Sequence, residues 1–144
     1  MRVLVQRCDK ASVTVDSKIV GSIDKGMMIL VGFTQSDTSE NIDYMVDKVL
    51  NLRIYDDDNG VMNKSILEVG GSILSVSQFT LYADTRKGRR PSYVNALNGE
   101  KAIVLYDEFN KKLKEHIHVE TGIFGAEMKV ELINDGPVTI LLEK

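Results

Sequence analysis

The residues best suited to chemistry lie in one stretch, from Ser77 to Ser92. It opens with a polar tetrad, Ser77-Gln78-Phe79-Thr80, directly after an apolar run over residues 73–76. Hydroxyls, an amide and an aromatic ring at a strand end are able to form the floor of a small-molecule pocket, because buried polar groups need partners that a polar ligand supplies. As a continued strand, the tetrad would direct Phe79 to one face and Gln78 and Thr80 to the other. From spacing alone, a purely structural strand whose hydroxyls face a polar layer explains the tetrad equally well.

Four cations follow the tetrad within five positions: Arg86, Lys87, Arg89 and Arg90. This basic loop, residues 86–90, is interleaved and flanked by Thr85, Gly88 and Ser92, whose hydroxyls and exposed backbone are further phosphate donors. A solvated surface loop is the usual alternative for such a run. The net charge of the chain is −3, which argues against a protein that binds nucleic acid over its whole surface. Any RNA contact must therefore come from a local patch.

Other clusters have simpler interpretations. Residues 56–60, Asp-Asp-Asp-Asn-Gly, lack the flanking ligands of an EF-hand and predict an acidic hairpin turn. His116 and His118 lie two apart without further ligands, so neither a metal nor a cofactor is expected. Cys8 lies within a predicted strand and should behave as a small buried hydrophobe. Gly136-Pro137 is read as the turn of a final hairpin, and the sequence does not decide whether its peptide bond is cis.

Regular elements must hold these residues in place. Alternating apolar residues predict strands near residues 2–8, 11–15 and 18–23, and a continuous apolar run predicts a central strand over 27–33, buried on both faces. A first helix should follow a capping box formed by Asp37 and Glu40, and a second should run from Gly99 to Glu115 behind an Asn98 cap. Short strands are expected at 53–55 and ahead of the tetrad, with further strands over 128–133 and 138–142. The pattern is a mixed α/β arrangement in which two helices cover a sheet.

Bulk properties favour a single cytoplasmic domain. A chain of 144 residues is long enough for one core. The single cysteine fits a reducing compartment, and the N-terminus lacks the features of a signal peptide. No apolar run approaches the length that spans a bilayer, so no membrane association is expected.

With these motifs in view, the chain closely resembles the D-aminoacyl-tRNA deacylases over essentially its whole length. The matching segments are residues 1–7, 11–13, 48–53, 77–92, 121–130 and 134–139. Both signatures of that family, Ser-Gln-Phe-Thr at 77–80 and Gly-Pro-Val-Thr at 136–139, are intact. The resemblance implies one compact domain over residues 1–144, in which mixed and antiparallel sheets form a barrel-like core with two helices packed on one side.

The resemblance also implies a function. Members hydrolyse D-aminoacyl-tRNA, and glycyl-tRNA including mischarged glycyl-tRNA(Ala), to free amino acid and tRNA, a proofreading activity that enforces L-homochirality. They are homodimers with active sites at the interface, where Gly136-Pro137 of one subunit, joined by a cis bond, enters the pocket of the other and rejects L-amino acids. The tetrad would form the floor, Phe124 and Met128 would line the pocket where the terminal adenosine docks, and Arg7 would brace the Gly-Pro segment. The partner is tRNA rather than DNA, with the basic loop as our candidate for its backbone.

The chemistry of the tetrad leaves alternatives open. Backbone N–H groups at Gln78 and Phe79 are candidates for stabilising an oxyanion. Thr80 needs an adjacent base to act as a nucleophile, and none is evident, so the resemblance points to the 2′-hydroxyl of the tRNA as the activating group. The alternatives are a small ester or amide hydrolase with Thr80 as nucleophile, and a non-catalytic RNA-binding dimerisation module.

Overall fold

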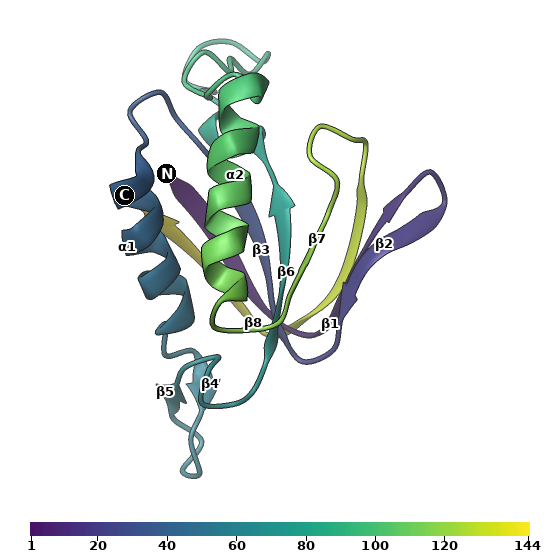
Figure 1. Ribbon diagram of the computed structural model, residues 1–144, viewed down its shortest axis with the longest axis vertical. Coiled ribbons are helices and arrows are strands. Elements are labelled where there is room, and N and C mark those ends of the chain that lie inside the picture. The colour runs from purple at the N-terminus through teal and green to yellow at the C-terminus, as the bar shows by residue number, and fades with distance from the viewer.

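The computed structural model describes residues 1–144 and contains a six-stranded mixed sheet, a two-stranded ribbon and two α-helices on one face of the large sheet (Figure 1). The elements in chain order are β1 (Arg2–Val15), β2 (Lys18–Ile23), β3 (Gly26–Gly32), α1 (Ser39–Leu50), β4 (Tyr55–Asp56), β5 (Met62–Lys64), β6 (Ser72–Ser77), the 3₁₀ helix η1 (Phe79–Tyr82), α2 (Gly99–Lys114), β7 (Val119–Thr121) and β8 (Lys129–Glu143). The predicted mixed α/β fold is confirmed.

The long strand β1 organises the sheet. On one side its first half pairs antiparallel with β3 and its second half with β2, while β8 pairs antiparallel along its other side. On its other edge, β3 pairs parallel with β6, and β6 in turn pairs parallel with β7. Parallel pairing brings the carboxyl ends of β3 and β6 to the same edge, and that edge holds the candidate site.

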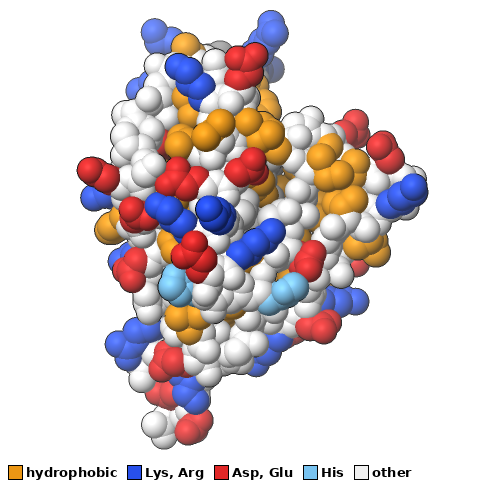
Figure 2. Space-filling model, in the orientation of Figure 1, with side chains coloured by type: hydrophobic (Ala, Val, Ile, Leu, Met, Phe, Trp, Pro, Cys, Tyr) orange, Lys and Arg blue, Asp and Glu red, His pale blue; other side chains and the backbone are white.

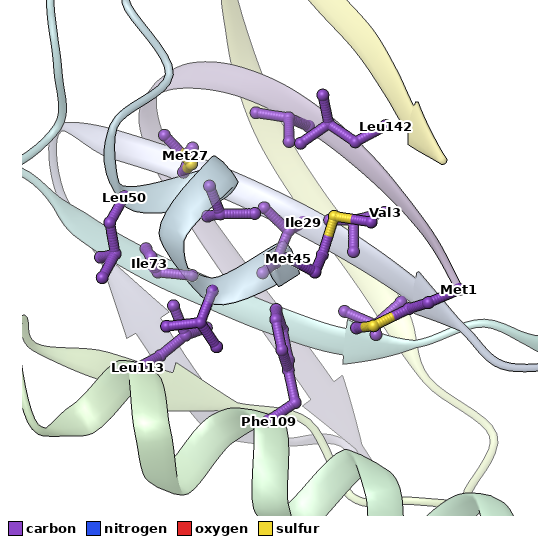
Figure 3. Packing of buried hydrophobic residues seen from close by; sticks show 14 of the residues in the cluster. Met1, Val3, Met27, Ile29, Met45, Leu50, Ile73, Phe109, Leu113 and Leu142 are labelled. Atoms are coloured by element: carbon purple, nitrogen blue, oxygen red, sulfur yellow. The ribbon is translucent and has the colours of Figure 1, made fainter. Parts of the chain in front are cut away.

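The larger core fills the space between the sheet and the helices. Alternate residues of β1 and β3, such as Val3 and Ile29, meet Met45 of α1 and Phe109 of α2 there, all fully buried (Figure 3). Met28 lies between Met27 and Ile29 of this core, and its side chain packs in a second cluster on the other side of the sheet. Strand β3 is therefore buried on both faces, as its continuous apolar run predicts.

The second, smaller core lies inside the curl of the sheet and includes Cys8, Val13 and Leu74. Strands β2 and β7 stand at opposite ends of the strand order, yet a Cβ added at Gly21 of β2 would lie 2.8 Å from the carbonyl oxygen of Thr121 of β7. The sheet thus curls almost to closure, which confirms the barrel-like core. Cys8 is 1% exposed and packs as the small hydrophobe that the sequence predicts.

The N-terminus of α1 differs from the prediction. Thr38 and Asn41 form the capping box, and Asp37 is released from capping for another contact. Its carboxylate accepts hydrogen bonds from the backbone N–H of Thr34 at 2.8 Å and from the amino group of Met1 at 2.5 Å. The predicted capping box of Asp37 and Glu40 was wrong, because Asp37 binds the amino group of Met1, 36 residues away in the chain. Local spacing does not reveal such a contact. The Asn98 cap of α2 is confirmed, since its side chain accepts from the N–H of Lys101.

The end of the chain also differs from the prediction. Residues 134–137 do not turn a hairpin, because both halves of β8 pair with β1 in one direction. Cys8 is opposite Asn134 and Gln6 is opposite Thr139, so the segment Asp135–Val138 bulges out opposite the single residue Arg7. The bulge re-aims the backbone without ending the strand.

The strand expected at 53–55 is β4, which is confined to Tyr55–Asp56, and the acidic turn after it is confirmed: Asp57 accepts from the N–H groups of Asn59 and Val61. Neither α-helix has the length and apolar character needed to cross a membrane.

Candidate active site

A cavity of about 600 Å³ opens where β3 and β6 end, bounded by the first turn of α2 and by the segment that joins β7 to β8. Most of its wall is apolar, as is usual for pockets that hold small molecules. Its lining residues are Val31, Gly32, Phe33, Val76, Ser77, Gln78, Phe79, Tyr93, Ala96, Leu97, Asn98, Gly99, Ala102, Phe124, Gly125, Ala126, Met128 and Val130.

The cavity brings together five residues that the sequence singles out. Ser77, Gln78 and Phe79 line it from the end of β6 and the start of η1, and Phe124 and Met128 line it from the segment between β7 and β8. These two groups are more than forty residues apart in the chain. They meet because β7 pairs parallel with β6, so the chain that leaves β7 passes beside the end of β6.

The tetrad is not a continued strand. Strand β6 ends at Ser77, the N–H of Gln78 donates to the carbonyl of Val31 at 2.7 Å, and the chain then enters η1. The hydroxyl of Thr80 accepts a hydrogen bond from the side-chain amide of Gln78 and does not line the cavity. Phe79 is 55% exposed, in a T-shaped pair with Tyr93 at 5.0 Å between ring centroids. The strand alternation predicted for Phe79 and Thr80 was therefore wrong.

Sequence reasoning missed much of the remaining wall. Val31, Gly32 and Phe33 lie at the carboxyl end of β3, beside the end of β6. A parallel β3–β6 pair would have indicated this position, but the sequence does not reveal which strands pair. The loop before α2 contributes Tyr93, and nothing in the local sequence marks that residue as part of a pocket.

The polar groups of the cavity are uncharged. Its lining offers the hydroxyls of Ser77 and Tyr93 and the amides of Gln78 and Asn98, with no carboxylate, imidazole, amine or thiol. Gly99 begins the 16-residue helix α2 at the cavity wall, and the unpaired N–H groups of a helix N-terminus give such a wall a partial positive charge. The cavity is thus suited to an uncharged or electron-rich group. Its side chains include no general base that could take a proton from water.

The basic loop projects beside this site. Backbone hydrogen bonds between Asp84 and Ser92 close its base, and every residue from Arg86 to Arg90 is exposed. Arg86 pairs with Asp84 at 2.6 Å, and hydrogen bonds from Arg86 lower the pKa of that carboxyl to about 2. Lys87, Arg89 and Arg90 have no acidic partner in the chain. Lys and Arg side chains accordingly gather at this end of the molecule (Figure 2).

The structure does not bring Gly136, Pro137 or Arg7 to this cavity. The Gly136–Pro137 peptide bond is cis, and both residues are exposed in the β8 bulge. Buried Arg7 contacts the bulge through Asp135 and also donates to the carbonyl of Ile54. Arg7 pairs with Met27 at the start of β3, whereas the cavity lies at the end of β3, about 17 Å away at the usual rise per residue.

Comparisons with known proteins agree with the motifs of the chain. A family model described as D-Tyr-tRNA(Tyr) deacylase matches residues 4–143. A Clostridium botulinum protein named D-aminoacyl-tRNA deacylase is 54% identical over 99% of this chain and 97% of its own length. A Geobacillus protein of the same name is 56% identical over 99% of this chain and 95% of its own length.

Solved structures share the fold. A protein described as c-Myc DNA Unwinding Element Binding Protein superimposes with a TM-score of 0.95 at 39% identity, over 100% of this chain and 99% of that one. A probable eukaryotic D-amino acid tRNA deacylase superimposes with a TM-score of 0.85 at 20% identity, over 98% and 97% of the two chains. The second likeness bears on the fold alone.

Proposed function

Because this chain belongs to the D-Tyr-tRNA(Tyr) deacylase family, we propose that it hydrolyses the ester that joins a D-amino acid to the terminal ribose of tRNA. The observation that carries the proposal is the cavity that Ser77, Gln78 and Phe79 line together with Phe124 and Met128. Its volume of about 600 Å³ falls in the range of small-molecule pockets. It has room for a terminal nucleoside with its amino acid. The product pair is free amino acid and tRNA, and the reaction requires no cofactor.

Each wall of the cavity has a role in the proposal. Phe124 and Met128 contact the terminal adenosine, since an aromatic ring and a flexible thioether suit the face of a base. Ser77 closes the floor. The backbone N–H of Phe79 faces the oxyanion that forms when water attacks the ester, whereas the N–H of Gln78 is engaged by the carbonyl of Val31.

The tRNA itself supplies the activating group. A threonine acts as a nucleophile only beside a base, and the hydroxyl of Thr80 meets only the amide of Gln78. The uncharged lining of the cavity favours the 2′-hydroxyl of the terminal ribose, which lies next to the ester in every aminoacyl-tRNA. Thr80 then positions Gln78 and does not attack.

Chirality is decided by a second copy of the chain. The carbonyls of Gly136 and Pro137 accept from the substrate ammonium and occupy the space into which an L side chain would point, so an L-amino acid is repelled. Glycine has no side chain to repel, which makes glycyl-tRNA, including mischarged glycyl-tRNA(Ala), a substrate as well.

The distance between the Gly-Pro motif and the cavity is our reason to propose a partner subunit. The motif lies about 17 Å along the sheet from the cavity of its own chain. A two-fold symmetric homodimer places each motif in the other cavity through one self-complementary surface. Support comes from β8, where Ile133 and Leu141 are each about half exposed on the strand that carries the motif. Arg7 holds the motif for insertion, through its contact with Asp135.

The decisive assay compares four substrates: D-tyrosyl-tRNA, L-tyrosyl-tRNA, glycyl-tRNA and a free D-tyrosine ester. Release of amino acid from the first and third only supports the proposal. Hydrolysis of the free ester at a similar rate would instead support a small-ester hydrolase, and no release from any substrate would favour a non-catalytic RNA-binding module.

The mechanism has its own test. Thr80→Ala should retain substantial activity, as should the control Thr14→Ala on β1, whereas tRNA with a 2′-deoxy terminal adenosine should not be hydrolysed. An inactive Thr80→Ala variant together with rapid hydrolysis of a 2′-deoxy substrate, whose ester is attached at the 3′ position, would restore Thr80 as the nucleophile.

The shared site is tested by mixing two impaired variants. Phe124→Asp places a negative charge in the cavity wall, and Gly136→Val strains a backbone with φ of +114°. Unfolding and refolding the two together should recover about a quarter of the wild-type activity, because half of the dimers are mixed and each has one intact composite site. A site built within a single chain would recover none.

A further inference from the structure

Arg2, the first residue of β1, joins the sheet to η1. Its Nη1 donates to the carbonyl of Leu81 at 2.7 Å, and its Nε donates to the carboxylate of Glu143 at 2.6 Å. The guanidinium carbon lies 4.6 Å from the centroid of the Tyr82 ring. Two of these three contacts fall on the last residues of η1, and the third fixes the guanidinium to the end of β8.

The turn η1 has few internal supports. Its hydrogen bond from the N–H of Leu81 to the carbonyl of Gln78 is long, at 3.4 Å, which is beyond the usual range. The next bond, from Ala83 to Thr80, is 3.0 Å. Contacts from the sheet therefore help to fix the position of η1. Arg2 of β1 supplies such contacts, because it is paired with Gly32 of β3, and η1 packs against Gly32.

We propose that Arg2 is a positioning residue for the deacylation site, because it clamps η1 to strand β1. This inference rests on the proposed function, since it concerns the backbone N–H of Phe79, the first residue of η1. A planar guanidinium donates along its edge and packs an aromatic ring on its face at the same time, which a lysine ammonium does not do. Arg2 touches neither the cavity nor the substrate.

The kinetic consequence separates this role from binding. Donors that face a developing oxyanion act in the transition state, so misplacing them lowers kcat more than it raises KM. Phe124 and Met128, which lie between β7 and β8 and not on η1, remain in place. Arg2→Lys should therefore lower kcat for D-tyrosyl-tRNA by about tenfold and leave KM within about twofold.

A matched control is available in the same chain. Arg53 also donates from Nε to a backbone carbonyl, that of Asn63, at 2.8 Å, but it lies beside the β4–β5 ribbon. Arg53→Lys should leave kcat and KM unchanged. Equal kinetics for wild type and Arg2→Lys would overturn the proposal, as would a rise in KM without a fall in kcat.

Hydrogen exchange tests the clamp without any substrate. In Arg2→Lys the amides of Leu81 and Ala83 should exchange several-fold faster than in wild type, while the amides of β3 such as Ile29 keep their protection. Faster exchange throughout β1 and β3 would show that Arg2 stabilises the sheet in general, and would overturn the proposal. A wild-type protein that releases no D-amino acid would refute the proposed function, and the exchange data would then decide the clamp by themselves.

Discussion

Arg7 and Asp135 fasten the β8 bulge to β1: Nε of Arg7 lies 2.8 Å from a carboxylate oxygen of Asp135. Arg7 is the one β1 residue opposite the bulge, and its Nη1 also donates to the carbonyl of Ile54 at 2.7 Å. A Cβ added at Gly136 would lie 3.2 Å from Nη2 of Arg7. The Gly-Pro segment is therefore presented at the surface by a buried cation that is held from two sides.

Arg7→Ala should destabilise the fold by about 2 kcal/mol, because it leaves the Ile54 carbonyl and the half-buried Asp135 carboxylate without their partner. Denaturation in urea measures the loss. The control is Arg86→Ala, which removes an exposed ion pair with Asp84 and should not change the unfolding midpoint. Equal stability of wild type and Arg7→Ala would show that the bulge is held by its backbone pairing alone.

Gly32→Ala should displace η1. The added Cβ would lie 2.8 Å from the carbonyl oxygen of Gln78 and 3.2 Å from Cβ of Leu81, so the turn must move outward at a cost of about 1–3 kcal/mol. A crystal structure or thermal unfolding measures the effect. In the control Gly99→Ala, the new Cβ has no atom nearer than 4.0 Å, and stability should be equal or higher. An unshifted η1 in Gly32→Ala would contradict the prediction.

Asp37→Asn should destabilise the protein by about 3 kcal/mol, since the amino group of Met1 and the Asp37 carboxylate are almost fully buried at 2.5 Å from each other and the variant leaves a buried charge unpaired. Chemical denaturation at neutral pH measures the loss. Asp58→Asn is the matched control, because the Asp58–Lys64 pair is exposed and should have no measurable effect. A small loss in Asp37→Asn would mean that water reaches the Met1 amino group.

Stability should fall in mild alkali. Burial raises the pKa of the Cys8 thiol from 9.0 to about 11, so the folded state holds this proton more tightly than the unfolded state. The corresponding stability is complete below the unfolded pKa and is lost as the pH rises toward the folded one. Cys8 should account for a loss of about 1 kcal/mol between about pH 8 and pH 10.

Cys8→Ala isolates this contribution. Its free energy of unfolding should be lower overall, since a small cavity replaces the thiol, but should fall less steeply over the same pH range. Burial also raises the pKa of Tyr82, to about 12, so both proteins should lose stability at still higher pH. Identical pH profiles below pH 10 would contradict the assignment to Cys8.

The basic loop should set the salt dependence of tRNA turnover. Lys87, Arg89 and Arg90 are free to meet phosphates, whereas Arg86 is engaged with Asp84. Replacing the three free cations by glutamine should reduce the slope of log kcat/KM against log salt by about 2–3, close to one unit for each lost phosphate contact. The control replaces three exposed lysines at the β1–β2–β3 end of the sheet, Lys10, Lys18 and Lys25. An unchanged slope in the loop variant would place the tRNA backbone elsewhere.

The sequence determined the elements whose signals are local. The apolar run at 27–33 fixed a strand buried on both faces, and Asn98 before Gly99 fixed the start of α2, because hydrophobic periodicity and capping depend on neighbours within a few residues. It also identified the tetrad and the Gly-Pro pair, since those residue types stand out against their surroundings.

Only the tertiary structure decided how these pieces meet. The pairing of β3 with β6 places Val31 and Gly32 beside Gln78. The pairing of both halves of β8 with β1 turns an apparent hairpin into a bulge opposite Arg7. Strand pairing joins residues far apart in the chain, and its energy depends on the packing of both faces rather than on local composition. For that reason the sequence named Gln78 and Gly136 together, and only the fold placed them apart, Gln78 directly after the end of β6 and Gly136 in the middle of β8.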